Sequence, residues 1–337
     1  MTARRFLTLA MLASLLAVPA TALAQDAPPG WTVPRTADGT PDFQGVWANN
    51  NATPLERPPE WAGKDRLTDE ELAELKASAA AVVASGLDAQ FGDQLVLKAI
   101  EGLKDAGSYD TTGNYNQFWM VARDFTNQTS LVVDPPDGRI PAMTEASRRR
   151  AADQRAYSEA HPADRPEDRP LGERCANFGV PRLGAGYNSY LQIFQTPDHV
   201  AVFKEMAHDV KVIPIDGGPH ASERIGLWNG DSRGHWEGDT LVVETTRFSE
   251  KSSFRGSAEG LHLVERYTRV GPEMLNYEVT ITDPTTWTRP WTVLIPLRHS
   301  SDPIFEYACH EGNYGMEGIL SGHRADERAA QAKTDGP

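Results

Sequence analysis

Segments rich in β-branched and aromatic residues follow one another along the second half of the chain, and they constrain the fold most strongly. They are residues 190–195, 200–205, 210–215, 240–248, 262–268, 274–282, 291–295 and 305–308. Short turn sequences separate most of them, whereas parallel strands would need crossovers of about a dozen residues. The pattern therefore predicts a mainly β fold in which an antiparallel meander closes into a barrel, with a two-layer sandwich as the alternative.

A helical region precedes these strands. Thr68 followed by Glu71 is the pattern of a capping box, because each residue can bond the backbone N–H of the other. This predicts a helix that runs to about Ser85. Further helical patterns cover residues 93–104 and 144–160.

Composition places the chain among soluble globular proteins. It has 337 residues, of which 39% are hydrophobic, and a formal net charge of −14. An acidic chain without clusters of Lys and Arg argues against a nucleic-acid partner, because phosphate neutralisation needs basic side chains on one face. We expect one domain over residues 25–337, with the helices as an insertion at about residues 65–160.

The first 24 residues have the pattern of a Sec signal peptide. Arg4 and Arg5 precede an apolar stretch at residues 6–18, and small residues lead to a cleavage site after Ala24. The alternative is a membrane anchor, but the apolar stretch is shorter than the roughly 20 residues that cross a bilayer. No later stretch is apolar enough to span one. The pattern predicts a periplasmic or secreted protein.

Two cysteines, Cys175 and Cys309, follow the signal. Export into an oxidising compartment and an even cysteine count predict that they form a disulfide. The alternative is a nucleophilic Cys309 activated by His310. Adjacent residues of a strand point to opposite faces, so that pair is poorly placed for catalysis.

A short motif points to one kind of barrel. Gly45, Val46 and Trp47 form a Gly-x-Trp sequence that resembles the opening of the first strand in lipocalin-like barrels. In that family the indole plugs one end of the barrel, and many members carry small molecules. The resemblance implies a barrel with an internal ligand site.

A second resemblance extends over nearly all of the chain after residue 24. It lies in residues 41–47, 53–57, 195–197, 216–220, 236–246, 283–291 and 306–313, with Cys175, His208, Glu265 and Arg266 between them. These sequences resemble a large, uncharacterised family of secreted bacterial proteins. The resemblance implies export and a β-rich fold, and it transfers no catalytic role.

Three histidines are the candidate catalytic residues. His208, His220 and His262 lie on or beside predicted strands and near carboxylates, among them Asp216 for His220 and Glu265 for His262. An imidazole oriented by a carboxylate is used in general acid/base catalysis and in metal binding. We therefore expect at least two of the histidines to share one pocket.

The favoured function is an exported enzyme that acts on a small, largely uncharged molecule by acid/base chemistry, as a lyase, isomerase or hydrolase. The first alternative is a non-catalytic binding protein of lipocalin type, whose interior should be almost wholly apolar. The second is a metal-dependent enzyme that uses the same histidines for a divalent ion. No cofactor is predicted apart from a possible divalent metal, and the lack of a GxxxxGK(S/T) motif argues against a nucleotide site.

Overall fold

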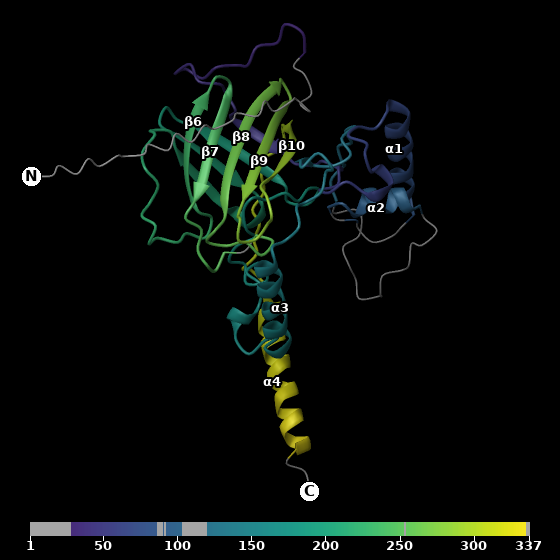
Figure 1. Cartoon of the computed structure of the whole chain (residues 1–337), viewed down its shortest axis with the longest axis vertical. Coiled ribbons are helices and arrows are strands. Elements are labelled where there is room, and N and C mark those ends of the chain that lie inside the picture. Colours follow the sequence, from purple (N-terminus) through teal and green to yellow (C-terminus); the bar gives the residue numbers. More distant parts are fainter. Residues whose placement is uncertain (1–27, 86–89, 91, 103–119, 253, 335–337) are drawn as a thin grey trace, which may run out of the picture.

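The computed structural model describes residues 28–85, 90, 92–102, 120–252 and 254–334 (Figure 1). The expected signal peptide lies outside these residues. The strands in the described part of the chain are β1 (Gly45–Ala48), β2 (Val132–Asp134), β3 (Tyr190–Gln195), β4 (His199–Lys204), β5 (Val210–Pro214), β6 (Asp231–Glu237), β7 (Thr240–Thr246), β8 (His262–Gly271), β9 (Met274–Thr282) and β10 (Trp291–Ser300).

The strands form one antiparallel sheet that curls into a nearly closed barrel. Within the described residues, nine strands follow the order β5-β4-β3-β1-β10-β9-β8-β7-β6, and β2 pairs with β10 outside this path. The strands β6 to β10 form one meander and β3 to β5 another, and β1 joins the two. The predicted antiparallel barrel is confirmed.

The two ends of the sheet, β5 and β6, meet through side chains. A Cβ added to Gly234 on β6 would lie 2.7 Å from Ile213 Cγ2 on β5 and 2.7 Å from Ile215 Cδ1. Glycine is therefore required here by the close approach of the two strands. An ion pair between Lys211 and Glu265 also connects β5, across the interior, to β8, which lies two strands before the other end of the sheet.

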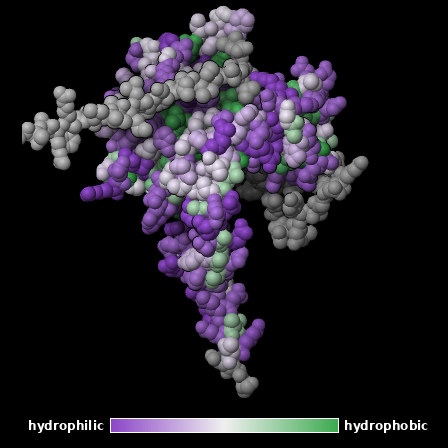
Figure 2. Space-filling model, viewed as in Figure 1, coloured by the Kyte–Doolittle hydropathy of each residue, from purple (hydrophilic) through white to green (hydrophobic). Residues whose placement is uncertain are grey.

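Four α-helices lie outside the barrel in the described part of the chain: α1 (Asp69–Ala84), α2 (Gln94–Glu101), α3 (Glu145–Ala160) and α4 (Tyr314–Thr334). The predicted capping box is present, since Glu71 N donates to Thr68 Oγ1 (3.2 Å) and Thr68 N to Glu71 Oε2 (2.9 Å). The helices α1 and α2 lie beside the barrel, whereas α3 and α4 project from one end (Figure 1). The projection is largely hydrophilic on its surface (Figure 2).

Three expectations about secondary structure were wrong or incomplete. Residues 305–308 form no strand, and most of their side chains are exposed. Helix α4 was not predicted, because Gly315, Gly318 and Gly322 weaken the helical signal in its first half. Strand β6 was not predicted either, since its outward residues are polar and its inward side includes Gly234.

The predicted disulfide is confirmed. Cys175 and Cys309, which are 134 residues apart, are bonded with a Cα–Cα distance of 5.6 Å. Cys309 is therefore not a free nucleophile. Among the described helices, none has the length and apolar character needed to traverse a membrane.

The Gly-x-Trp sequence lies at the start of strand β1. Gly45 has a φ of +121°, and β1 begins there. Trp47 is completely buried, and its Nε1 donates to the carbonyl of Phe43 (2.8 Å). The indole is thus held in the core by β1 and by the segment before it.

Candidate functional site

A carboxylate lies inside the barrel. Inward residues alternate along β8, so Glu265 points into the interior together with Leu263 and Tyr267. Glu265 is 2% exposed. It bonds Lys211, and it accepts hydrogen bonds from the hydroxyl of Tyr277 (2.9 Å) and, at 3.4 Å, from that of Tyr267. The sequence could predict its burial only from strand alternation.

Hydroxyl groups complete this internal network. Thr245 Oγ1 donates to Glu265 Oε2 (3.2 Å) and also lies 2.9 Å from Ser232 Oγ. Burial raises the pKa of Glu265, but the positive charge of Lys211 and its hydrogen bond outweigh burial, so the pKa lies below its usual value. The carboxylate is therefore ionised and already occupied by partners.

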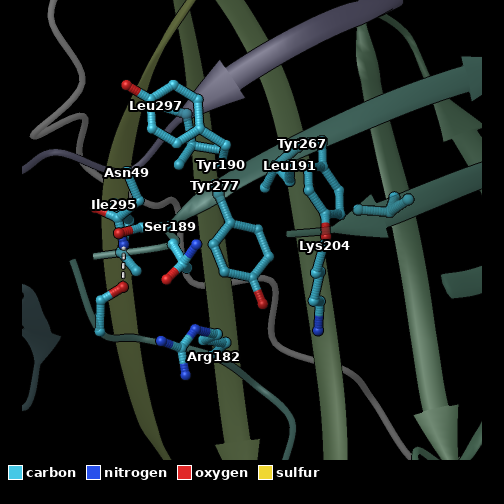
Figure 3. A pocket seen from close by; sticks show the side chains of 13 residues that line it. Asn49, Arg182, Ser189, Tyr190, Leu191, Lys204, Tyr267, Tyr277, Ile295 and Leu297 are labelled. Atoms are coloured by element: carbon cyan, nitrogen blue, oxygen red, sulfur yellow. Dashed lines mark hydrogen bonds between the residues drawn. The ribbon is translucent and has the colours of Figure 1, made fainter. Parts of the chain in front are cut away.

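A cavity lies beside this network, and Figure 3 shows the side chains that line it. Its empty space is about 500 Å³ when open solvent at its mouth is included, and the room for the centre of a water molecule inside it is about 40 Å³. Its aliphatic walls come from strands β3, β4 and β10. These walls are Leu191, Val202, Ile295 and Leu297.

The polar groups of the cavity include two cations. Figure 3 shows the ends of Arg182, Lys204 and Tyr277 at the lower side of the view, with Leu191 and Leu297 at the upper side. Arg182 Nε is buried and has no hydrogen-bond partner among the described residues. The same is true of the amide oxygen of Asn49, whose nitrogen donates to Gly184 O (3.0 Å).

Lys204 differs from an ordinary surface lysine. Burial, and after it the nearby ammonium of Lys211, lower its pKa to about 8. Glu265 and Asp209 act in the opposite sense but do not compensate. Burial also lowers the pKa of Arg182. The cavity thus places two cationic groups in a largely apolar surrounding.

The structure brings two of the three predicted histidines together, but on the outer face of the barrel. His220 Nδ1 lies 2.8 Å from Asp231 Oδ2, and His262 Nε2 lies 2.7 Å from Glu244 Oε1. His220 Nε2 lies 3.7 Å from the other oxygen of Glu244. Thr245 points inward, so its neighbour Glu244 points outward.

The expected carboxylate partners of these histidines were wrong. His262 and Glu265 are three positions apart on β8 and therefore lie on opposite faces, which strand alternation could have revealed. Asp216 accepts from the backbone N–H of Gly218 (2.9 Å) in its own turn and does not orient His220. Asp231 and Glu244 were missed because they are distant from the two histidines in the sequence and come close to them only in the folded protein.

The remaining histidine, His208, does not join the others. It is exposed and ends the 3-10 turn Met206–His208 between β4 and β5. The expected single pocket of histidines inside the barrel is therefore not found. The catalytic role of His220 and His262 stays a prediction.

The residues suited to a divalent ion are different from the predicted histidines. In the described part of the chain, the group whose ligand atoms all lie within 4.8 Å of one another is Asp164, His323 and Glu327. His323 Nε2 lies 3.1 Å from Asp164 Oδ1 and 3.6 Å from Glu327 Oε1. His161 Nδ1 lies 2.7 Å from Asp164 Oδ2. This group connects α4 to the segment after α3, in the projection below the barrel (Figure 1).

Fold and cavity together define a β-barrel whose interior combines aliphatic walls with a cationic end. No protein-family model, curated protein or solved structure matches the chain. The function is therefore argued from the cavity and from the surface histidines alone.

Proposed function

We propose that the barrel binds a small molecule with an apolar body and an oxygen-bearing end. One observation carries the proposal: Arg182, whose Nε is a buried donor without a partner among the described residues, lines a cavity with aliphatic walls. A buried donor without a partner costs roughly 1–3 kcal/mol. A ligand oxygen in this place would recover that free energy.

The charge of the cavity favours an anionic or strongly polar oxygen. Lys211 and Glu265 compensate each other in a buried pair. Arg182 and Lys204 then leave the lining with a positive charge at neutral pH. This differs from the sequence-based expectation of a largely uncharged ligand, and it disfavours a carrier for purely apolar molecules. A carboxylate on an aromatic or short aliphatic body fits both parts of the lining.

Calorimetric titration with benzoate and benzyl alcohol tests the proposal. We expect benzoate to bind more tightly, and Arg182→Met to weaken benzoate by about tenfold or more, since a charged hydrogen bond contributes roughly 1.5–3 kcal/mol. Val202→Trp should fill the cavity and abolish binding of both. Arg165→Met, at a side chain that is 65% exposed, is the matched control. Benzoate binding that survives Val202→Trp unchanged in a folded protein would refute the cavity as its site.

Acid/base catalysis by His220 and His262 is the second candidate. The observation that favours it is their convergence on Glu244, with Asp231 on the far nitrogen of His220. Loss of a general acid or base costs about 10²–10⁴ in rate. If the protein is a hydrolase, His220→Gln should lower the rate of hydrolysis of small aryl esters by that factor and leave the affinity for benzoate unchanged. Equal rates of ester hydrolysis for the variant and the parent protein would show that His220 has no catalytic role in this reaction.

Export is the third part of the proposal. The bond between Cys175 and Cys309 agrees with an oxidising compartment. Residues 1–24 then act as a signal that is cleaved after Ala24. Amino-terminal sequencing of the protein from a periplasmic or culture fraction should begin at Gln25. An intact Met1 in cell-associated protein would contradict cleavage.

A further inference from the structure

We propose that the amine of Lys204 is a nucleophile that forms an imine with an aldehyde or ketone bound in the barrel cavity. The proposal rests on the ligand-binding function above and names a class of ligand for it. It requires an amine that faces the cavity, that is free of a competing partner, and that reaches its neutral form near neutral pH.

The position of Lys204 satisfies the first requirement. It is the last residue of β4 and follows the inward residues Val200 and Val202 at the same spacing of two. It lines the cavity together with Val202 and Leu191. Its side chain is only partly exposed, and Figure 3 shows it among the other lining residues.

The second requirement, an amine without a competing partner, is satisfied because the nearby carboxylate pairs with another lysine. Val202 is paired with Lys211 across β4 and β5, so Lys204 is the diagonal neighbour of Lys211 on the inner face. Lys211, and not Lys204, bonds Glu265. No hydrogen bond or ion pair joins Lys204 Nζ to any residue that the structure describes. The carboxylate of Glu265 is thus paired with Lys211 and not with Lys204.

The charges around the amine satisfy the third requirement. Lys211 on β5 and Arg182 disfavour a second positive charge, while Glu265 on β8 and Asp209 favour it. Burial is the largest effect, and the pKa of Lys204 falls from 10.5 to about 8. The neutral fraction near pH 7 is then about 300 times that of an unperturbed lysine. A lysine in an apolar pocket beside a second cation is a known kind of activated nucleophile.

The reaction is balanced without an oxidant or reductant. The neutral amine adds to the carbonyl carbon, and the C–N bond forms as the C=O bond opens to a carbinolamine. The two amine protons leave with the carbonyl oxygen as water, and a C=N bond remains. The aliphatic walls at Leu191 and Ile295 limit access of water to this bond. Arg182 can donate to an oxygen of the ligand.

Reductive trapping with benzaldehyde and cyanoborohydride tests the proposal. The reductant converts an imine into a stable benzylamine, which intact mass and peptide mapping can locate. At limiting aldehyde we expect one benzyl group, placed on Lys204, before the exposed residues Lys76 and Lys251 react. Lys204→Arg keeps the charge but should lose this product, and Lys76→Arg is the matched control. Val202→Trp keeps the amine and should suppress its labelling.

Several outcomes separate this proposal from the cavity-binding proposal. Equal labelling of Lys76, Lys251 and Lys204 would overturn the nucleophile, and so would unchanged labelling of the Lys204→Arg protein. Benzoate binding without trapping at Lys204 would refute the imine and leave the ligand site intact. Trapping at Lys204 in a protein that binds no benzoate would support the nucleophile and refute the anion-binding function. Melting temperatures of the variants establish that they are folded.

Discussion

Lys211 and Glu265 are bonded to each other inside the barrel, although they lie on strands β5 and β8, which are not neighbours in the sheet. Their side chains are 6% and 2% exposed. The pair connects β5, at one end of the sheet, to β8, which lies two strands before the other end. It also pairs the internal carboxylate with Lys211, so that Glu265 forms no ion pair with Lys204.

Removing one member of this pair should destabilise the protein strongly. Glu265→Gln leaves the Lys211 ammonium buried without its counter-charge, a change that typically costs about 3–5 kcal/mol in the free energy of unfolding. Denaturant unfolding measures the loss. Glu244→Gln, at an exposed carboxylate on β7, is the control and should cost less than about 1 kcal/mol. Equal losses for the two variants would contradict the role of the internal pair.

The lowered pKa of Lys204 predicts how stability depends on pH. Burial and the charge of Lys211 favour the neutral amine in the folded protein, whereas the unfolded chain keeps an ordinary pKa. Between pH of about 8 and 10.5 the unfolded state therefore binds more protons, and the contribution of Lys204 to stability rises with pH.

Comparison of the parent protein with Lys204→Met isolates this contribution. The free energy of unfolding of the parent protein should rise by about 1–3 kcal/mol relative to the variant between pH 8 and 10.5. Denaturant midpoints at several pH values supply the measurement. A difference that stays constant over this interval would show that Lys204 titrates like a surface lysine.

The close approach of β5 and β6 predicts the effect of a single methyl group. Gly234→Ala should clash with Ile213 and Ile215 and lower stability by about 1–3 kcal/mol. Gly318→Ala is the matched control, because a Cβ there meets nothing within 4 Å in helix α4. That variant should be neutral or more stable by up to about 1 kcal/mol. Thermal unfolding of both decides whether the two strands pack as described.

A divalent ion, which the sequence left open as an alternative, has a suitable place at Asp164, His323 and Glu327. Zinc accepts imidazole and carboxylate ligands. If the ion binds there, zinc should raise the melting temperature by mass action, and His323→Ala should remove the effect. His310→Ala, at an exposed histidine, is the control. An unchanged melting temperature with excess zinc would exclude this site.

The barrel could be predicted because each strand is recognisable from its own residues. The candidate site could not, because it depends on which strands lie side by side in the folded protein. Capping at Thr68 and strand patterns such as residues 274–282 depend on neighbours in the sequence. The contact of His262 with Glu244, by contrast, depends on the register of β7 and β8. Strand alternation was a usable signal, since it separates His262 from Glu265.

The cavity itself had no sequence signal. Arg182 lies outside the described strands. Lys204 is the last residue of a strand, a position at which an exposed lysine would give the same sequence pattern. Their common place in the lining follows from the curvature of the sheet and from the loop before β3. Only the structure could therefore distinguish these two cations from the other basic residues of the chain.

The most direct measurement is an isotope-filtered NMR experiment on methyl-labelled protein with unlabelled benzoate. The ring protons should show contacts to methyl groups of Leu191, Val202 and Ile295, the aliphatic walls of the cavity. The same contacts should be lost in Val202→Trp. Contacts from benzoate only to methyl groups outside this lining, or none at ligand concentrations that saturate binding, would contradict a ligand site inside the barrel.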